Sequence, residues 1–111
     1  MSSEEPKRIA VEARREVIPM FVAQDNIHAF RTPPVDLARW SIIDIPVSLP
    51  RDPVAVFVQV KFPPNTDLSV SDNFATLVSI ATRNLIRVNV WRVDANADPS
   101  INYAFSVMIT T

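Results

Sequence analysis

The sequence predicts an all-β fold, an antiparallel β-sandwich or jelly-roll-like single domain. Short apolar stretches with strand alternation recur about every ten residues, which is typical of β-sandwiches, jelly rolls and small barrels. The chain has ten prolines and no glycine, so its turns must use Pro, Asn and Asp in longer or type I connections. No segment has the clear amphipathic helical pattern that an α/β fold needs.

Residues 1–17 form a charged segment. The chain has 11 basic and 12 acidic residues, and eight of these lie in the first sixteen positions. Residues 8–17 fit a strand or a helix equally well. We expect residues 1–17 to be an arm or edge segment that a neighbouring subunit must order, because it buries little apolar surface. Residues 18–111 then form the β-sandwich domain, which is expected to stay folded when residues 1–16 are deleted.

The segment after the arm has weak strand signals. Pro19 cannot donate a hydrogen bond to a ladder, so residues 17–23 favour an edge strand or a bulged one. Residues 24–36 contain Pro33 and Pro34 and are predicted to form a long loop.

Residues 37–45 indicate a strand, which the spaced prolines of 46–53 bring to an end. Trp40 alternates with Ile42 in this strand, which favours a place in the core for Trp40. Residues 54–62 give the strongest strand signal, because apolar side chains recur there at a period of two. The face that they form consists of Val54, Val56, Val58, Val60 and Phe62. Prolines on both sides mark the ends of this strand.

Three more strands are predicted towards the C-terminus. Residues 74–81 fit a strand or a helix, and their β-branched content favours a strand. Strict alternation indicates strands over 85–94 and 101–109, joined by a turn at 94–99. Their apolar faces are formed by Ile86, Val88 and Val90, and by Ile101, Tyr103, Phe105, Val107 and Ile109.

Composition restricts the possible functions. Without glycine, the chain lacks the phosphate-binding loops and dinucleotide fingerprints of nucleotide enzymes. Without cysteine, it has no disulfide, thiol nucleophile or thiolate metal site. A net charge of -1 provides no field to attract nucleic acid or an acidic membrane surface. No apolar run approaches the ~20 residues that cross a bilayer, and the N-terminus lacks a secretory signal pattern, so we expect function without export.

Catalytic and metal-binding patterns are weak. His28 is the only histidine, so neither a two-histidine metal site nor a serine–histidine relay with a spare base can form within one chain. We expect it to face solvent or to be hydrogen-bonded. Residues 94–98 resemble a calcium loop only superficially, since the loop glycine and the final glutamate are missing. We therefore predict no enzymatic activity, no metal and no cofactor.

The arm and one strand supply candidate interface residues. Trp91 lies opposite the apolar face of its strand, beside Arg87 and Asn89, so alternation places it outward, as in many interfaces. A sheet covered on both faces would instead make Trp91 a second-layer core residue, and both interpretations stay open. Arginine outnumbers lysine nine to two, which favours bidentate ion pairs at an interface. The predicted interface residues are Arg8, Arg14, Arg15, Arg87, Asn89 and Trp91.

The MSSEEPKRIAVEARREV opening, the length, the absence of Gly and Cys, and the all-β pattern ending in INYAFSVMITT resemble the small staple proteins of epsilon-fifteen-type short-tailed bacteriophages. The resemblance covers the whole chain. It implies a jelly-roll-like virion protein, made in the host cytoplasm, on the outer surface of an icosahedral head. There it would bind across neighbouring major capsid subunits as a homodimer and reinforce the shell, with no catalytic residues.

Two other functions compete with this one. A carbohydrate-binding β-sandwich module would stack Trp91 or Tyr103 on a sugar ring, with Arg87, Asn89 and Asn102 as polar partners. A barrel that binds single-stranded nucleic acid would need a basic groove with aromatic residues, which the net charge disfavours. We expect no nucleic acid, membrane or small-molecule substrate as a partner.

Overall fold

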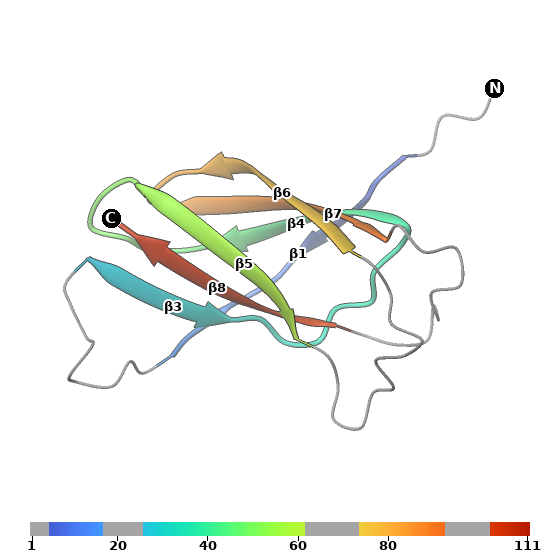
Figure 1. Cartoon of the computed structure of the whole chain (residues 1–111), viewed down its shortest axis with the longest axis horizontal. Coiled ribbons are helices and arrows are strands. Elements are labelled where there is room, and N and C mark those ends of the chain that lie inside the picture. The colour runs from blue at the N-terminus through green and yellow to red at the C-terminus, as the bar shows by residue number, and fades with distance from the viewer. Residues whose placement is uncertain (1–4, 17–25, 62–73, 93–102) are drawn as a thin grey trace.

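The computed structural model of the chain describes residues 5–16, 26–61, 74–92 and 103–111. Within these residues the chain forms strands and no helix (Figure 1), so none of them lies in a helix that could span a membrane. The strands are β1 (Lys7–Ala10), β2 (Arg14–Arg15), β3 (Ile27–Arg31), β4 (Trp40–Pro46), β5 (Ala55–Lys61), β6 (Phe74–Ala81), β7 (Leu85–Arg92) and β8 (Ala104–Thr110). They build two four-stranded sheets around one core, which confirms the predicted all-β sandwich.

The strands alternate between the two sheets along most of the chain. One sheet has the order β1-β4-β7-β6 and the other β2-β3-β8-β5. From β3 onward the chain changes sheet at every step except between β6 and β7, which are neighbours. The pairs are antiparallel except β1 with β4, which is parallel. The sandwich is therefore mainly antiparallel, as predicted, and no tight hairpin constrains the direction in which β1 pairs with β4.

The core is formed by every second side chain of the strands, as the period of two requires. The inward residues include Phe30 of β3, Ile43 and Ile45 of β4, Ile86, Val88 and Val90 of β7, and Phe105, Val107 and Ile109 of β8. β5 adds Val56, Val58 and Val60 at the margin of this core. Full burial of such a side chain contributes roughly 1.5–3 kcal/mol, so the core is the main source of stability.

Four predicted strands are confirmed within the described residues. The predictions over 54–62, 74–81, 85–94 and 101–109 correspond to β5, β6, β7 and β8. The strand predicted over 17–23 and the turn predicted over 94–99 lie outside the described residues. The prediction over 37–45 is confirmed from Trp40 onward, since β4 begins there.

Residues Ile27–Arg31 form β3, so the predicted long loop over 24–36 is wrong. β3 pairs with β8 along its whole length and places His28 and Phe30 inward. Its sequence signal is weak, because one of the two inward side chains is polar and two prolines follow soon after. Pairing with the apolar strand β8 holds this segment extended, as tertiary context does for many strands.

Trp40 lies on the outer face of its sheet, which corrects its predicted place in the core. β4 turns Ser41, Ile43 and Ile45 inward and leaves Trp40 and Ile42 on the other side. An error of one residue in the predicted inward set turns every side chain of the strand to the opposite face, because side chains alternate with a period of two. The inner set is hard to recognise since it begins with a serine, whose hydroxyl accepts a hydrogen bond from the Ala38 N–H at 3.0 Å.

Residues 5–16 pack on the sheets of their own chain (Figure 1). β1 is an edge of one sheet and β2 is an edge of the other. Between them Val11 is buried in the core, and its N–H donates to the Asp44 carbonyl at 3.0 Å. The open choice between strand and helix over 8–17 is resolved in favour of strand structure. The edge pairing that we expected from a neighbouring subunit is supplied here by β4 and β3 of the same chain.

Candidate protein-binding surface

The outer face of the β2-β3-β8-β5 sheet carries exposed apolar side chains. Phe57 of β5 lies opposite Met108 of β8, which in turn lies opposite Ala29 of β3. Phe57 is 62% exposed and Met108 48%. Val54 is 81% exposed, and its N–H donates to the Thr110 carbonyl at 2.7 Å, which fixes it beside the same strand pair. Phe57 and Met108 are called the apolar patch below, and Val54 lies just before β5.

The apolar patch follows from the alternation that builds the core. Val56 and Val58 point between the sheets, so Phe57 must point outward. Val107 and Ile109 are buried in the same way, so Met108 points outward from β8. Solvent-facing positions of a sandwich are usually polar, so adjacent large apolar side chains there make this face a candidate binding surface.

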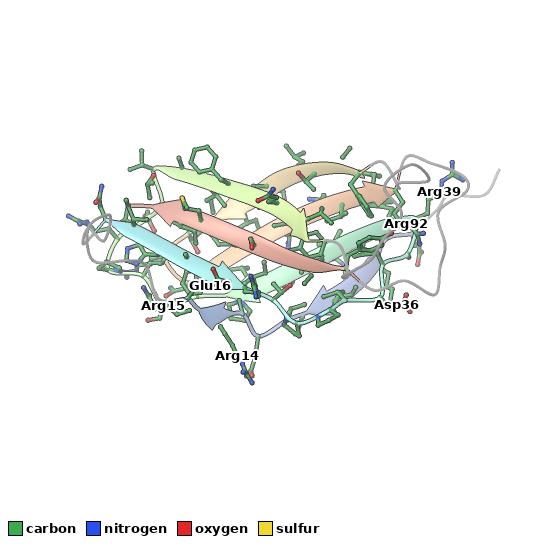
Figure 2. All side chains as sticks on the ribbon, turned by 60° about the horizontal axis from the view of Figure 1, so that its bottom comes forward. Arg14, Arg15, Glu16, Asp36, Arg39 and Arg92 are labelled. Carbon is green, nitrogen blue, oxygen red and sulfur yellow. The ribbon has the colours of Figure 1, made fainter. Side chains whose placement is uncertain are left out.

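Basic side chains lie on the same outer face, two residues along the strands from the apolar patch. Arg14 of β2 is paired in register with Arg31 of β3, so two like charges stand opposite each other. The Arg31 Nε lies 2.8 Å from the Glu16 carboxylate, which offsets one of these charges. Arg14 extends away from the sheet (Figure 2) and forms no hydrogen bond or ion pair with any described residue. Its guanidinium is therefore free to meet a partner.

Arg15 turns the other way and holds the edge of its own sandwich. Its Nη1 donates to His28 Nδ1 at 3.0 Å, and its Nη2 lies 3.4 Å from the Ser48 carbonyl. The guanidinium carbon lies 5.0 Å from the centre of the Phe30 ring, within the range of a cation–π contact. Arg15, which the sequence suggested as an interface residue, is thus already engaged within the chain.

His28 is buried and held in its neutral form. An arginine can only donate, so Nδ1 accepts from Arg15 and the ring proton must be on Nε2, 3.3 Å from Thr111 Oγ1. Burial is the largest cause that lowers the pKa of His28, followed by the positive charges of Arg15 and Arg51. The histidine is hydrogen-bonded at the core margin.

The outer face of the opposite sheet is covered by its own contacts. Trp40 and Trp91 stand opposite each other on β4 and β7, with ring centres 6.2 Å apart and planes at 16°. Trp91 therefore points outward, but its neighbouring indole covers part of it and both rings are half-buried. An offset stacked pair of this kind stabilises a sheet surface beyond the area that it buries.

Polar residues of this second face are also engaged. The Arg87 Nε and Nη2 donate to the two carboxylate oxygens of Asp44 at 2.6 and 3.1 Å, a bidentate pair between β7 and β4. These hydrogen bonds are the main cause that lowers the pKa of Asp44 and raises that of Arg87. The Asn89 amide donates to Ser79 Oγ at 2.9 Å. The interface residues predicted on β7 thus contact residues of the two adjacent strands, β4 and β6, within the same sheet.

Arg8 lies at the edge of this second face, exposed on β1 and opposite Ile42. Leu77 of β6 is the large apolar side chain that this face exposes among the described residues, at 57%. It lies opposite Asn89, with no second large apolar residue exposed next to it on β7. The second face therefore presents single exposed groups rather than an apolar patch.

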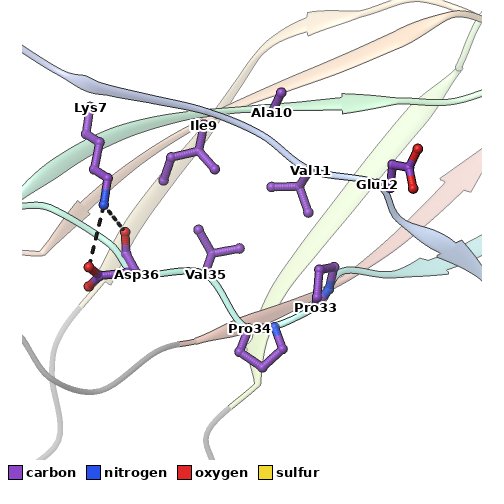
Figure 3. A pocket seen from close by; sticks show the side chains of 9 residues that line it. All are labelled: Lys7, Ile9, Ala10, Val11, Glu12, Pro33, Pro34, Val35 and Asp36. Atoms are coloured by element: carbon purple, nitrogen blue, oxygen red, sulfur yellow. Dashed lines mark hydrogen bonds and ion pairs between the residues drawn. The ribbon is translucent and has the colours of Figure 1, made fainter.

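A shallow hollow of about 310 Å³ lies between β1 and residues 33–36 (Figure 3). Val11 and Val35 point into it, and Lys7 closes one end by donating to the Asp36 carbonyl at 2.9 Å. The Lys7 ammonium also lies 3.6 Å from the Asp36 carboxylate. A second hollow of about 850 Å³ shares the walls near Pro33 and extends to Arg14 and Arg31. Its lining combines prolines and alanines with these two arginines, Glu12 and Thr32.

Within the described ranges, no group of three or more His, Asp or Glu side chains is placed to hold a metal ion. The calcium-like residues 94–98 lie outside those ranges. Comparisons with known protein families, with curated proteins and with solved structures find no match for this chain.

The structure separates the predicted interface residues into three groups. Arg14 is exposed beside the apolar patch, and Arg8 is exposed at the far edge of the other sheet. Arg15 is engaged at the core margin. The three predicted on β7 form the covered face, namely Arg87, Asn89 and Trp91. The apolar patch was not among the candidates, although the alternation that placed Val56 and Val58 in the core also placed Phe57 outside it.

Proposed function

We propose that this chain is a structural virion protein that binds the outer surface of an icosahedral phage head and staples neighbouring major capsid subunits. In this role it acts as a homodimer, without catalysis or a cofactor. The resemblance to phage staple proteins gives the proposal its specific form. The exposed surface of the β2-β3-β8-β5 sheet gives it physical support.

The observation that carries the proposal is the apolar patch of Phe57 and Met108. Burying a large apolar side chain against another protein contributes roughly 1.5–3 kcal/mol. Arg14, on the same face, can donate both arms of its guanidinium to a carboxylate of the partner. Aromatic, methionine and arginine side chains are the residues enriched in protein–protein interfaces.

Stapling requires only modest affinity at each contact. A dimer that touches two shell subunits converts its second contact into an intramolecular event, so avidity exceeds the affinity of one contact. Repeated over a whole shell, such contacts raise the barrier to rupture collectively. A rigid sandwich with engaged side chains on one face and free apolar ones on the other is suited to this task.

Two features support protein binding over the carbohydrate-binding alternative. Tyr103 is buried in the core, so its ring cannot stack on a sugar. Trp91 is half-covered by Trp40, and the polar groups beside it already bond within the chain. A sugar site needs such groups free to converge on the ligand.

The test measures attachment of the purified protein to phage shells that lack it, by co-sedimentation. Phe57→Ser and Met108→Ser are each expected to weaken attachment about tenfold or more, which corresponds to about 1.4 kcal/mol. Leu77→Ser is the matched control, because Leu77 is similarly exposed on the opposite sheet. Thermal unfolding of each variant checks that the fold is intact.

Attachment by Phe57→Ser and Met108→Ser equal to that of the unchanged protein would refute the apolar patch as the binding surface. The stapling function is contradicted if shells without this protein withstand heat as well as complete shells. Binding in a glycan screen, with no attachment to shells, would favour the carbohydrate-binding alternative.

A further inference from the structure

The sandwich has four sheet edges, and they differ in how well they are protected against pairing with another strand. β1 and β6 are the edges of one sheet, and β2 and β5 are the edges of the other. An edge strand offers unpaired N–H and C=O groups, and proteins protect such edges with short strands, charges, prolines or bulges.

Three of the edges carry such protection. β1 has four residues, follows Pro6 and carries Lys7 and Arg8. β2 has two residues, and both are arginines. β6 is longer, but its register shifts between Val78 and Ile80, which is a bulge that twists an edge away from regular pairing.

β5 carries none of these protections. Its seven residues pair with β8 in an unbroken register, and they include no proline. Its single charged residue, Lys61, is the last one of the strand. Among the strands that the structure describes, β8 is the only partner of β5.

The hydrogen-bond pattern identifies the free backbone groups of β5. On β8, Phe105 and Thr111 exchange backbone bonds with the β3 side, since Thr32 N–H donates to Phe105 O and Thr111 N–H to Asn26 O, both at 2.9 Å. Hydrogen-bonding direction alternates along a strand, so Ser106, Met108 and Thr110 face β5. Their register partners on β5, which are Gln59, Phe57 and Ala55, face β8 in return. This leaves the N–H and C=O groups of Val56, Val58 and Val60 directed to the open edge.

A second copy of the same strand complements these groups. When β5 runs antiparallel to itself about Val58, Val56 faces Val60 of the other copy and each Val58 faces the other. Every such pair exchanges two backbone hydrogen bonds, so all three open residues of each copy are satisfied. Lys61 falls opposite Ala55, so no like charges meet across the junction.

We propose that two copies of this chain pair through β5 to form one continuous eight-stranded sheet about a two-fold axis. Such an isologous contact is self-complementary, as closed dimers require. In each copy, the face of β5 formed by Val56, Val58 and Val60 stays directed at that copy's own core. The contact also joins the two apolar patches on the outer face, because Phe57 of one copy lies opposite Gln59 of the other. The inference rests on the proposed function in taking the protein to be a homodimer, and it assigns β5 as the surface that holds the second copy.

Disulfide trapping tests the register, and the absence of native cysteine makes every cross-link unambiguous. Residues 57 and 59 of opposite copies form a non-hydrogen-bonded pair with Cα atoms about 4.5 Å apart, within disulfide range. An oxidised mixture of Phe57→Cys and Gln59→Cys chains is expected to give a covalent mixed dimer. Either variant alone is expected to give much less, because like positions are only diagonal neighbours, roughly 7–8 Å apart.

Val58→Pro tests the edge itself. It removes an N–H that faces the open edge and leaves the β8 ladder intact, which an edge strand tolerates. Sedimentation equilibrium is expected to show its mass fall from twice 12.4 kDa to 12.4 kDa. Val58→Thr keeps the N–H and a similar shape, so it is expected to remain dimeric.

The proposal is overturned if the unchanged protein is monomeric at high concentration, if folded Val58→Pro keeps the mass of a dimer, or if the cysteine mixture gives no more cross-link than the single variants. If Val58→Pro does not fold, the cross-linking result decides. If the unchanged protein is a dimer that Val58→Pro dissociates, and yet fails to attach to shells, the β5 pairing stands and the stapling function is refuted, so the two failures are distinguishable.

Discussion

The two outer faces of the sandwich use similar kinds of side chain in opposite ways. On the β1-β4-β7-β6 sheet, the aromatic and charged residues meet partners on the next strand, as in the Trp40–Trp91 stack and the Asp44–Arg87 pair. On the β2-β3-β8-β5 sheet, Phe57 and Met108 stand opposite each other and remain about half or more exposed, and Arg14 bonds to no described residue.

The difference shows that residue type alone does not mark a binding surface. Tryptophan and arginine are common in interfaces, yet on the first face Trp40 and Trp91 stack on each other and Arg87 pairs with Asp44 across the strands. What marks the second face is exposed apolar area with no neighbour to cover it. Register therefore decides which face is available, because it determines which side chains stand opposite each other.

The prediction with the largest expected effect removes β1, the edge strand of the covered face. Deletion of residues 1–16 takes away β1 and β2 and the buried Val11, so it opens the core at one side of both sheets. We expect a loss of about 3–5 kcal/mol in the free energy of unfolding, from lost apolar burial and ladder hydrogen bonds. Urea unfolding measures it. A truncated chain with an unchanged midpoint would support the sequence-based expectation that the sandwich folds without residues 1–16.

Two single substitutions, one on each outer face, compare the faces directly. Trp91→Ala removes the stacked ring of the covered face and is expected to destabilise the fold by about 2 kcal/mol, since the ring is half-buried and contributes stacking as well as burial. Phe57→Ala is expected to stay within about 0.5 kcal/mol of the unchanged protein, as exposed positions do. Urea midpoints of the two variants give the comparison. Equal destabilisation by both would show that Phe57 is part of the fold rather than a free surface.

The sequence predicts the strands with regular apolar alternation and misses those without it. β5, β7 and β8 are evident because their inner faces are uniformly apolar. β3 is missed because His28 occupies an inner position, and its burial depends on a hydrogen bond from Arg15, a residue of another strand. No local pattern contains that contact.

The candidate surface was predictable only in part. The outward direction of Phe57 follows from its own strand, but its place opposite Met108 depends on a pairing between strands far apart in the chain. Trp91 was predicted to be outward or in a second layer, and which one depended on Trp40, whose face the sequence suggested wrongly. An error of one residue in the inward set therefore explains the misplaced Trp40, whereas the missed apolar patch and the engaged Arg15 depend on contacts between distant parts of the chain.

A smaller effect concerns the ion pair of the covered face. Asp44 has a lowered pKa, chiefly through its hydrogen bonds from Arg87, so its carboxylate binds protons less readily in the folded chain than in the unfolded one. Its stabilising contribution is present above its ordinary pKa of 3.8 and is lost as the pH falls through the lower folded value. Asp44→Asn should therefore flatten the acid-side loss of stability, measured as urea midpoints at pH 5 and pH 3. Asp36→Asn, at an exposed edge pair, is the control, and an equal effect of both would contradict this role.

The smallest expected effect concerns His28 and Arg15, which are hydrogen-bonded to each other at the core margin of the β2-β3-β8-β5 sheet. His28 has an ordinary pKa of 6.5, and burial first and Arg15 second lower it in the folded chain. As the pH falls below about 6.5, the unfolded chain therefore takes up a proton that the folded chain does not, and stability decreases until the folded pKa is passed. Unfolding between pH 7.5 and 5.5 should show this decrease, whereas His28→Gln, which cannot titrate, should show a smaller one. The single imidazole can also be followed by NMR, where Arg15→Met should raise its pKa by removing the facing charge. A folded-state imidazole that titrates at or above 6.5 would contradict the neutral, Arg15-bound histidine and, with it, the engaged role of Arg15 that separates it from the free Arg14.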